Sequence, residues 1–349
     1  MKFEIIKYSS KDLNELINLA KTYYKNNDMT DSAYLDWQYF SNPNGVPYLF
    51  IGRTIPLNEI AGQYLVIPIE LKYFKNKKSG SLSLNTLTAP EYQGNGLFTE
   101  MAKETYIYCA QNNIDLTIGF PNPNSYPGFV RKLEFKHLGN VPLLIKPINI
   151  FGMIKSFFKK RGVKHGEEIN CDEIHSNEIL KFDFNSIEHK EKYQIFWTEV
   201  KRKYQISLNK DYRFINWRYN LIPTRNYQIY FSEENGRMID FLITKTTNVW
   251  GSRVGVIMDI LTIYDSPVNS PCLSHFYRIA KKTKLDFIAC LHSENHESKI
   301  LKKDGFYKFP ENFLPQQIHF IVRNNTNFID KRAFDMKNWK LTFGDYDVF

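Results

Sequence analysis

The sequence predicts an α/β (α+β) protein with two similar domains, each a mixed, mostly antiparallel sheet flanked by helices. Two observations indicate this class. An apolar strand at residues 81–88 leads through a glycine-bearing turn into an amphipathic helix that runs to about Asn112,. The segment around Trp37 also has a counterpart around Trp217, 180 residues later along the chain. Together they indicate that one unit occurs twice.

A second pair of anchors has equal spacing in the two halves. The strand that begins at Asp115 leads to Phe135, and the strand that begins at Asp286 leads to Phe306, 20 residues later in both cases. Each half therefore reads as a helix, central antiparallel strands, a crossover helix, a strand and a helix. This order predicts two copies of one fold in tandem.

The length of 349 residues exceeds that of a usual single domain,. We expect a first domain at residues 1–148, a basic linker at 149–195 and a second domain at 196–349. Hydrophobic residues make up 43% of the chain, which is enough for each domain to bury a core of its own,.

The turn Gln93-Gly94-Asn95-Gly96 is the most informative chemical feature. Glycine lacks the Cβ atom that would hold a ligand away from the backbone. The first N–H groups of the helix that follows have no partner within the helix, and they lie at its positive dipole end. We therefore expect this turn to bind a pyrophosphate.

This strand, turn and helix, followed by a second strand and helix, resemble the acetyl-CoA-binding core of the Gcn5-related N-acetyltransferase (GNAT) superfamily. The turn of that family reads Gln/Arg-x-x-Gly-x-Gly/Ala, and Gln93 and Gly96 match it. Phe98 stands where the family usually has its last small residue. Val130 and Glu134 replace the Tyr and Gly of the family's later Tyr-x-x-x-Gly-Phe motif. The resemblance therefore transfers the cofactor site better than the catalytic site.

The resemblance covers roughly residues 2–139 and implies acetyl-CoA as the co-substrate, without a metal. The expected cofactor-binding residues lie at the strand end, in the turn and in the loop before the later helix: Leu87, Thr88, Gln93, Gly94, Asn95, Gly96, Leu97, Phe98, Asn122 and Asn124. Two roles remain open for the asparagines in the Pro-Asn-Pro-Asn loop, because they suit pantetheine amides and also form turns.

The second copy differs where a cofactor would bind. After the matching strand it carries Asp265, Pro267 and Pro271 in place of the glycines. Proline lacks an N–H donor and an acid repels phosphate. We expect one CoA site per chain, in the first domain.

Acyl transfer needs a polarised carbonyl and a proton for the departing thiolate. The resemblance assigns the first role to the backbone N–H of Leu87 or Thr88. Tyr126 lies one helical turn before Val130 and is the candidate general acid, with a role in starting the helix as an equal alternative,. No glutamate stands on the core strand, where Ser83 and Asn85 occupy the positions expected for a base.

Two other segments offer a base. His137 is one, although a partly exposed histidine at a strand start explains it as well. The aromatic carboxyl-terminal tail resembles the Trp-x-x-Thr-x-Gly-Asp-x-Asp ending of GNAT-type acyltransferases of surface-polysaccharide biosynthesis. More distantly, it resembles the "enhanced intracellular survival" aminoglycoside acetyltransferases. The resemblance makes Asp345, Asp347 and the terminal carboxylate of Phe349 candidates for substrate binding or catalysis, with a final strand of the second sheet as the alternative.

Composition limits the remaining choices. The net charge of +9 suits an anionic ligand, but acidic residues are interleaved with the basic ones, so nucleic acid is not the expected partner,. The basic and apolar run at residues 151–161 fits a linker helix better than a membrane-surface helix,. The four cysteines are dispersed without metal-type pairing, which favours reduced thiols in cores,. The sequence shows no signal peptide or membrane span, and we expect a cytoplasmic protein,.

The sequence thus predicts an acetyl-CoA-dependent N-acyltransferase that acts on an amino group of a sugar, a sugar nucleotide or a related small polar amine. An aminoacyl transferase that uses tRNA to modify a cell-wall precursor is one alternative. A non-catalytic GNAT-like binding module is the other, and the intact turn argues against it. The oligomeric state and the acyl chain length stay open.

Overall fold

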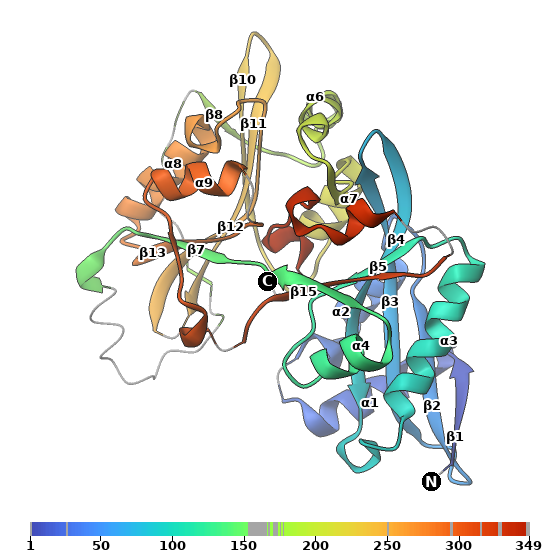
Figure 1. Cartoon of the computed structure of the whole chain (residues 1–349). Helices are drawn as coiled ribbons and strands as arrows, with labels where there is room; N and C mark the ends of the chain where they lie inside the picture. Colours follow the sequence, from blue (N-terminus) through green and yellow to red (C-terminus); the bar gives the residue numbers. More distant parts are fainter. Residues whose placement is uncertain are drawn as a thin grey trace. The chain divides into compact units, whose positions relative to one another are not determined.

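The computed structural model describes residues 2–25, 27–152, 166, 168–169, 174, 176, 178–249, 251–293, 296–314, 316–326 and 330–346. The chain forms two compact units, which we call unit 1 and unit 2 (Figure 1). Unit 1 comprises Met1–Asn140, Leu221–Arg225 and Gln317–Asp335, and unit 2 comprises Val141–Asn220, Asn226–Gln316 and Met336–Phe349. The units interleave along the chain, whereas the sequence analysis drew contiguous ranges.

The sheet of unit 1 has the strand order β1-β2-β3-β4-β5-β15-β6. Its strands are β1 (Lys2–Lys7), β2 (Tyr48–Ile55), β3 (Ile60–Tyr73), β4 (Asn76–Thr88), β5 (Leu116–Gly119), β6 (Lys136–Asn140) and β15 (His319–Asn324). Strands β4 and β5 are parallel, and the other pairs are antiparallel. A parallel pair needs a crossover connection, and α3 (Leu97–Gln111) supplies it,.

Helices cover both faces of this sheet. On one face, α3 and α4 (Tyr126–Lys132) bury an apolar stripe against Tyr64 and Val66 of β3. The buried positions of α3 recur at helical spacing, which is why this segment folds as a helix against a sheet,. On the other face, α1 (Leu13–Tyr23) packs through Ala20 against Leu87 of β4, and α2 (Ser32–Phe40) follows α1 along the chain.

The sheet of unit 2 has the strand order β14-β7-β13-β12-β11-β10-β8. Its strands are β7 (Leu143–Pro147), β8 (Ile179–Lys181), β10 (Gln228–Glu234), β11 (Arg237–Val249), β12 (Ser252–Thr262), β13 (Phe287–Leu291) and β14 (Tyr307–Lys308). Again one pair, β12 with β13, is parallel, and α8 (Pro271–Lys282) forms its crossover.

The helices of unit 2 repeat the arrangement of unit 1. The core beneath α8 and α9 (His296–Lys303) includes Phe276 and Leu301. On the opposite face, Tyr193 of α6 (Ile187–Val200) contacts Phe241 of β11, with ring centroids 4.7 Å apart. A short α7 (Tyr212–Ile215), its π-helical continuation (Asn216–Asn220) and β9 (Ile206–Leu208) complete the unit. The predicted fold class, two mixed and mostly antiparallel sheets flanked by helices, is confirmed.

Strands of each half of the chain also lie in the sheet of the other half. Strand β7 follows the first half of the chain but lies between β13 and β14 in unit 2. Strand β15 follows the second half but lies between β5 and β6 in unit 1. Each exchanged strand is anchored by a basic residue to the end of a helix: Arg323 donates to the Leu133 carbonyl, and Lys146 pairs with Asp304 at 2.8 Å. This exchange explains why the compact units interleave.

Candidate functional site

The site in unit 1 begins where β4 loses its neighbour. The parallel pairing of β4 with β5 ends at Ser83 and Gly119, but β4 continues for five more residues to Thr88. On its other side β4 stays paired with β3 as far as Gly62 and Thr88. The last residues of β4 therefore present one unpaired backbone edge.

A bulge shapes this stretch of β4. The register between β3 and β4 shifts between Gln63 and Leu65, and Asn85 has a left-handed backbone with φ +49°,. Its backbone carbonyl accepts a hydrogen bond from the side chain of Gln63 at 2.6 Å, and its side-chain amide donates one to the side chain of Gln38 at 2.5 Å. The bulge is thus held by side chains of β3 and α2. Asn85 is therefore part of this scaffold.

The register decides which backbone group faces the unpaired edge. Ala89 N–H donates to the Ala61 carbonyl at 2.9 Å, so these residues form a hydrogen-bonded pair. Hydrogen-bonded and non-hydrogen-bonded pairs alternate along an antiparallel ladder. The N–H of Leu87 therefore bonds across to β3, and the N–H of Thr88 points away from β3. Of the two predicted candidates, Thr88 has its N–H directed to the side on which β5 has ended.

The glycine turn follows directly. Gly94 and Gly96 have φ values of +80° and +84°, a left-handed conformation that side chains with a Cβ rarely adopt,. A Cβ at Gly94 would meet no atom within 4 Å, and one at Gly96 only the Glu100 side chain at 3.9 Å. The turn is open on its outer side, as a surface that receives a phosphate must be.

We call the turn at residues 93–96 the cradle. Its other residues hold it in place. Gln93 donates to the Thr88 carbonyl at 3.1 Å, which ties the turn to the strand end, and Asn95 donates to the Tyr92 carbonyl at 3.2 Å. The Leu97 side chain is buried and would clash with a Cβ at position 52, which explains Gly52 in β2. Leu97 can therefore serve a ligand only through its backbone.

Phe98 fixes α4 beside the start of α3. Its ring lies 5.5 Å from that of Phe129, and a Cβ at Gly128 would come within 3.0 Å of it. A side chain in place of Gly128 would push α4 away from α3. The Phe98 ring thus packs α4 against α3. Only the backbone N–H of Phe98, in the first turn of α3, is left for a ligand.

Tyr126 stands at the start of α4, two residues before this contact. Its N–H donates to the Asn122 carbonyl at 2.9 Å. The Asn122 side-chain oxygen accepts the N–H groups of Asn124 and Ser125, both at 3.0 Å. Asn122 therefore forms the turn that starts α4, while the Asn124 side chain is exposed.

The Tyr126 ring also contacts two histidines of the same unit. One is the predicted His137 on β6, and the other is His319 on β15. Sequence reasoning missed His319, because no motif links it to α4 and only the exchanged strand brings it there. Ser83, the other position expected for a base, bonds to the Tyr64 hydroxyl at 3.3 Å.

The profile of the acetyltransferase (GNAT) domain family matches residues 4–138 of the sequence. The matched residues lie in unit 1. This range ends inside β6 and includes the unpaired end of β4, the cradle and α4. No curated protein matches the chain.

Several solved structures share the fold of the whole chain. A GCN5-related N-acetyltransferase from Anabaena variabilis is 13% identical, with a TM-score of 0.63, and the alignment covers 93% of this chain and 73% of that one. A conserved protein of unknown function from Enterococcus faecalis V583 is 11% identical, with the same TM-score and coverage. Saccharomyces cerevisiae N-myristoyltransferase with bound myristoyl-CoA is 11% identical, with a TM-score of 0.60 and coverage of 97% and 89%. At these identities the likeness establishes the fold alone.

The position in unit 2 that corresponds to the cradle of the GNAT domain is closed. The fully buried carboxylate of Asp240 accepts the Cys272 N–H at 2.8 Å and the Ser270 hydroxyl at 2.6 Å. Ser270 in turn caps the Leu273 N–H at 2.9 Å, and Pro271 has no N–H to offer,. The protein's own carboxylate thus takes the place that an external anion would need at this helix start.

In unit 2, the carboxyl-terminal tail lies between β12 and β13, at the point where these two strands separate. Thr342 forms a bridge with His292, just after β13, and its hydroxyl donates to Asp259 of β12 at 2.7 Å. Nearby, Lys340 pairs with Glu297 and contacts the buried His292 ring. Burial, and then the charge of Lys340, lower the pKa of His292. The tail therefore occupies the part of unit 2 where β12 leaves β13.

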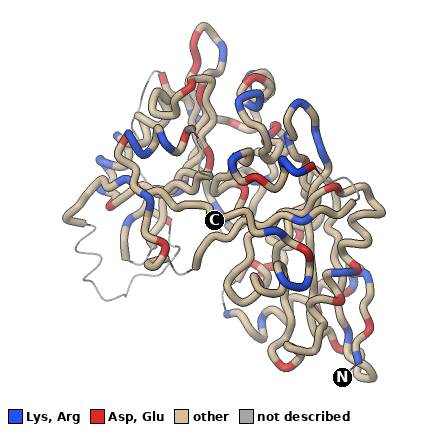
Figure 2. The backbone as a smooth tube through the Cα atoms, viewed as in Figure 1, with Lys and Arg blue, Asp and Glu red and all other residues tan. Residues whose placement is uncertain are grey.

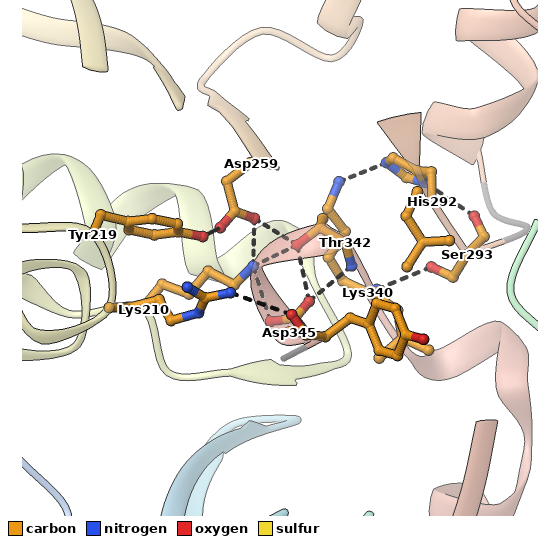
Figure 3. Close-up of polar contacts among 12 residues, drawn as sticks. Lys210, Tyr219, Asp259, His292, Ser293, Lys340, Thr342 and Asp345 are labelled. Atoms are coloured by element: carbon orange, nitrogen blue, oxygen red, sulfur yellow. Dashed lines mark hydrogen bonds and ion pairs between the residues drawn. The ribbon is translucent and has the colours of Figure 1, made fainter. Parts of the chain in front are cut away.

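Asp345, a residue of this tail, lies in a buried cluster of charged side chains (Figure 3). It pairs with Lys210 at 3.0 Å and accepts the Thr342 N–H at 2.8 Å. Lys210 also pairs with Asp259, which the Tyr219 hydroxyl contacts. Burial raises the pKa of Asp345 although Lys210 opposes the shift. The described part of the tail includes a 3-10 helix, Phe343–Asp345.

The catalytic role of Asp345 stays a prediction, and its contacts are those of a structural ion pair. Asp347 and Phe349, the other tail candidates, lie outside the described residues. Most of the basic run at 151–161 and Cys171 also lie outside them.

The described residues also bear on the compositional expectations. Lys and Arg are interspersed with Asp and Glu in the described parts of both units (Figure 2). Cys109, Cys272 and Cys290 are buried free thiols, and burial raises the pKa of Cys109 to about 12. Within the described ranges, no helix is long and apolar enough to cross a membrane, and no group of metal-binding side chains gathers.

Proposed function

We propose that this chain is an acyl-CoA-dependent N-acyltransferase that uses acetyl-CoA to acetylate an amino group on a sugar, a sugar nucleotide or a related small polar amine. The observation that carries the proposal is the left-handed pair Gly94 and Gly96, open to solvent at the start of α3 and directly after the unpaired end of β4. Backbone N–H groups at such a helix start suit a pyrophosphate.

The chain is, on this proposal, a tandem GNAT protein with one working site. The equal order of elements in the two units supports the tandem arrangement. The Asp240 carboxylate at the start of α8 and the tail between β12 and β13 support a single CoA site, in unit 1. The second half of the chain then contributes β15, a strand of the working domain.

The chemistry follows from two groups of unit 1. The amine nitrogen attacks the thioester carbon, and the bond between carbon and sulfur breaks. Thr88 N–H would donate to the carbonyl oxygen as it gains charge, which lowers the barrier most when the donor is already in place. Tyr126 would give its proton to the departing thiolate, and the proton that the amine nitrogen loses would pass to water and restore the Tyr126 hydroxyl.

The acceptor class rests on the lack of a strong base. Ser83 and Asn85 hold internal hydrogen bonds and offer no carboxylate on β4. An amine on a sugar has a lower pKa than a lysine side chain, so part of it is neutral near pH 7 and needs no strong base. Asp345 and Phe349 remain proposals for acceptor binding.

The resemblance to polysaccharide-modifying enzymes supports the same class. A cytoplasmic location is part of the proposal, since the reaction consumes acetyl-CoA.

Thermal shift measurements test the cofactor first. Only a ligand that prefers the native state raises the midpoint, so acetyl-CoA should raise it and tRNA should not. Myristoyl-CoA belongs in the same series, because the yeast N-myristoyltransferase of the same fold binds it. A shift with tRNA alone would instead support the aminoacyl-transferase alternative.

A panel of amino sugars and nucleotide-linked amino sugars then tests the acceptor, with release of free CoA as the measurement. If acetyl-CoA binds but no acceptor in the panel releases CoA, the non-catalytic binding module becomes the better explanation.

A further inference from the structure

The strand that the second half of the chain contributes to unit 1 ends beside the proposed site. Gly119, the last residue of β5, pairs with Ser83 of β4 on one side and with Ile321 of β15 on the other. Because β15 runs antiparallel to β5, residues before Ile321 lie beyond the carboxyl end of β5. His319 is two residues before Ile321, so it lies past the end of β5, as does the unpaired stretch of β4 that leads to Thr88.

His319 makes direct ring contact with the candidate acid. The rings of Tyr126 and His319 are stacked, with centroids 4.3 Å apart and an interplanar angle of 30°. The His137 ring meets the Tyr126 ring edge-on at 5.3 Å and the His319 ring at 5.1 Å. The tyrosine ring is therefore held on a face and on an edge by two strands, β15 and β6.

The His319 ring is itself fixed. Its Nδ1 lies 2.8 Å from the side-chain oxygen of Asn140, its register partner on β6. This contact with the neighbouring strand fixes the orientation of the ring.

We propose that His319 is a positioning residue for the acyl transfer, which holds the Tyr126 ring so that its hydroxyl is presented to the leaving thiolate. The inference rests on the proposed function. A tyrosine at the first position of a short helix has little helix around it to restrict its ring, and a stacked partner supplies that restriction. A catalytic group that is displaced by about 1 Å loses about a hundredfold in rate.

The first test is a kinetic series with acetyl-CoA and the panel amine that turns over fastest. His319→Ala should lower kcat about tenfold or more and leave the KM for acetyl-CoA within about twofold, because the cradle is untouched. His319→Phe keeps a ring to stack on Tyr126 and should restore most of kcat.

In a Tyr126→Phe background, His319→Ala should have no further effect on kcat, because positioning acts through the hydroxyl. A further loss in that background would overturn the inference.

The second test does not need activity. In the chain without cofactor, the NMR signals of the His319 ring should shift when Tyr126→Ala removes the stacked ring, and they should shift again on addition of acetyl-CoA to the unmodified protein. His189 is the control, since it also contacts an aromatic ring, that of Phe231 in unit 2, with centroids 4.7 Å apart and an interplanar angle of 70°. His189→Ala should leave kcat unchanged, and the His189 signals should not move.

The outcomes separate the two proposals. If the unmodified protein binds no acetyl-CoA, the proposed function fails whatever the histidine signals do. If the unmodified protein turns over and folded His319→Ala retains its full kcat, the positioning role is wrong while the acyltransferase proposal stands.

Discussion

The cradle can be tested by adding a single methyl group at each of three glycines. Gly94→Ala and Gly96→Ala place a Cβ on the surface proposed to receive the pyrophosphate. Gly236→Ala is the matched control, because Gly236 has φ +74° and a Cβ there would meet no atom within 4 Å, but it lies in the β10–β11 hairpin of unit 2. The three changes have the same backbone cost and differ in location.

The magnitudes follow from the geometry. An alanine in a left-handed conformation costs about 1 kcal/mol, and no clash adds to it, so each variant should lose about 2–4 °C in Tm. A charge-assisted hydrogen bond from a backbone N–H to a phosphate is worth about 1.5–3 kcal/mol. Losing one such bond at Gly94 or Gly96 should weaken acetyl-CoA binding by about 10- to 150-fold.

Titration calorimetry with acetyl-CoA and thermal melts followed by circular dichroism give both quantities. Gly236→Ala should melt like the other two variants and bind acetyl-CoA like the unmodified protein. The reasoning is refuted if folded Gly94→Ala and Gly96→Ala keep full affinity. Equal losses of affinity in all three variants would show that binding follows global stability and not the cradle.

Further predictions concern stoichiometry, catalysis and two buried acids. Titration of the unmodified chain should saturate near one acetyl-CoA, and two equivalent sites would contradict the closed start of α8. Tyr126→Phe should lower kcat about 10²-fold or more with little change in acetyl-CoA affinity, measured by CoA release. Burial raises the pKa of Asp240, so the native state binds its proton more readily than the unfolded state. Urea unfolding should therefore show the unmodified protein gaining stability relative to Asp240→Asn as the pH falls from neutral toward about 4, and losing that gain as the pH rises. Asp345→Asn should cost about 3 kcal/mol of stability, because it leaves Lys210 buried with one carboxylate fewer, and a change in the acceptor KM alone would instead favour an acceptor role,.

Local chemistry made part of this site predictable. The order of a strand, a glycine-bearing turn and a helix was predicted, and the structure has it as β4, the turn and α3. Pro267 and Pro271 indicated a different helix start in the second half, but the carboxylate that closes it comes from Asp240, on a strand 31 residues before Pro271 and without any motif.

Other features could not be read from the chain because they depend on pairing between distant strands. Nothing in the sequence of β7 or β15 distinguishes a strand that stays in its own half from one that crosses to the other. The contact of His319 with Tyr126 depends on that choice. The choice of Thr88 over Leu87 likewise needs the register with β3, which composition does not reveal.

The exchange of strands also orders events in time as the chain is made. When residue 148 leaves the ribosome, β5 and β6 are complete, but β15, which must lie between them, is about half the chain away. Strand β7 is complete as well and has none of its neighbours yet. During this interval the nascent protein has open strand edges, the feature most prone to pair with a second chain. We expect a fragment of residues 1–148 to associate in size-exclusion chromatography, and a monomeric, fully folded fragment would show that the edges are protected in another way.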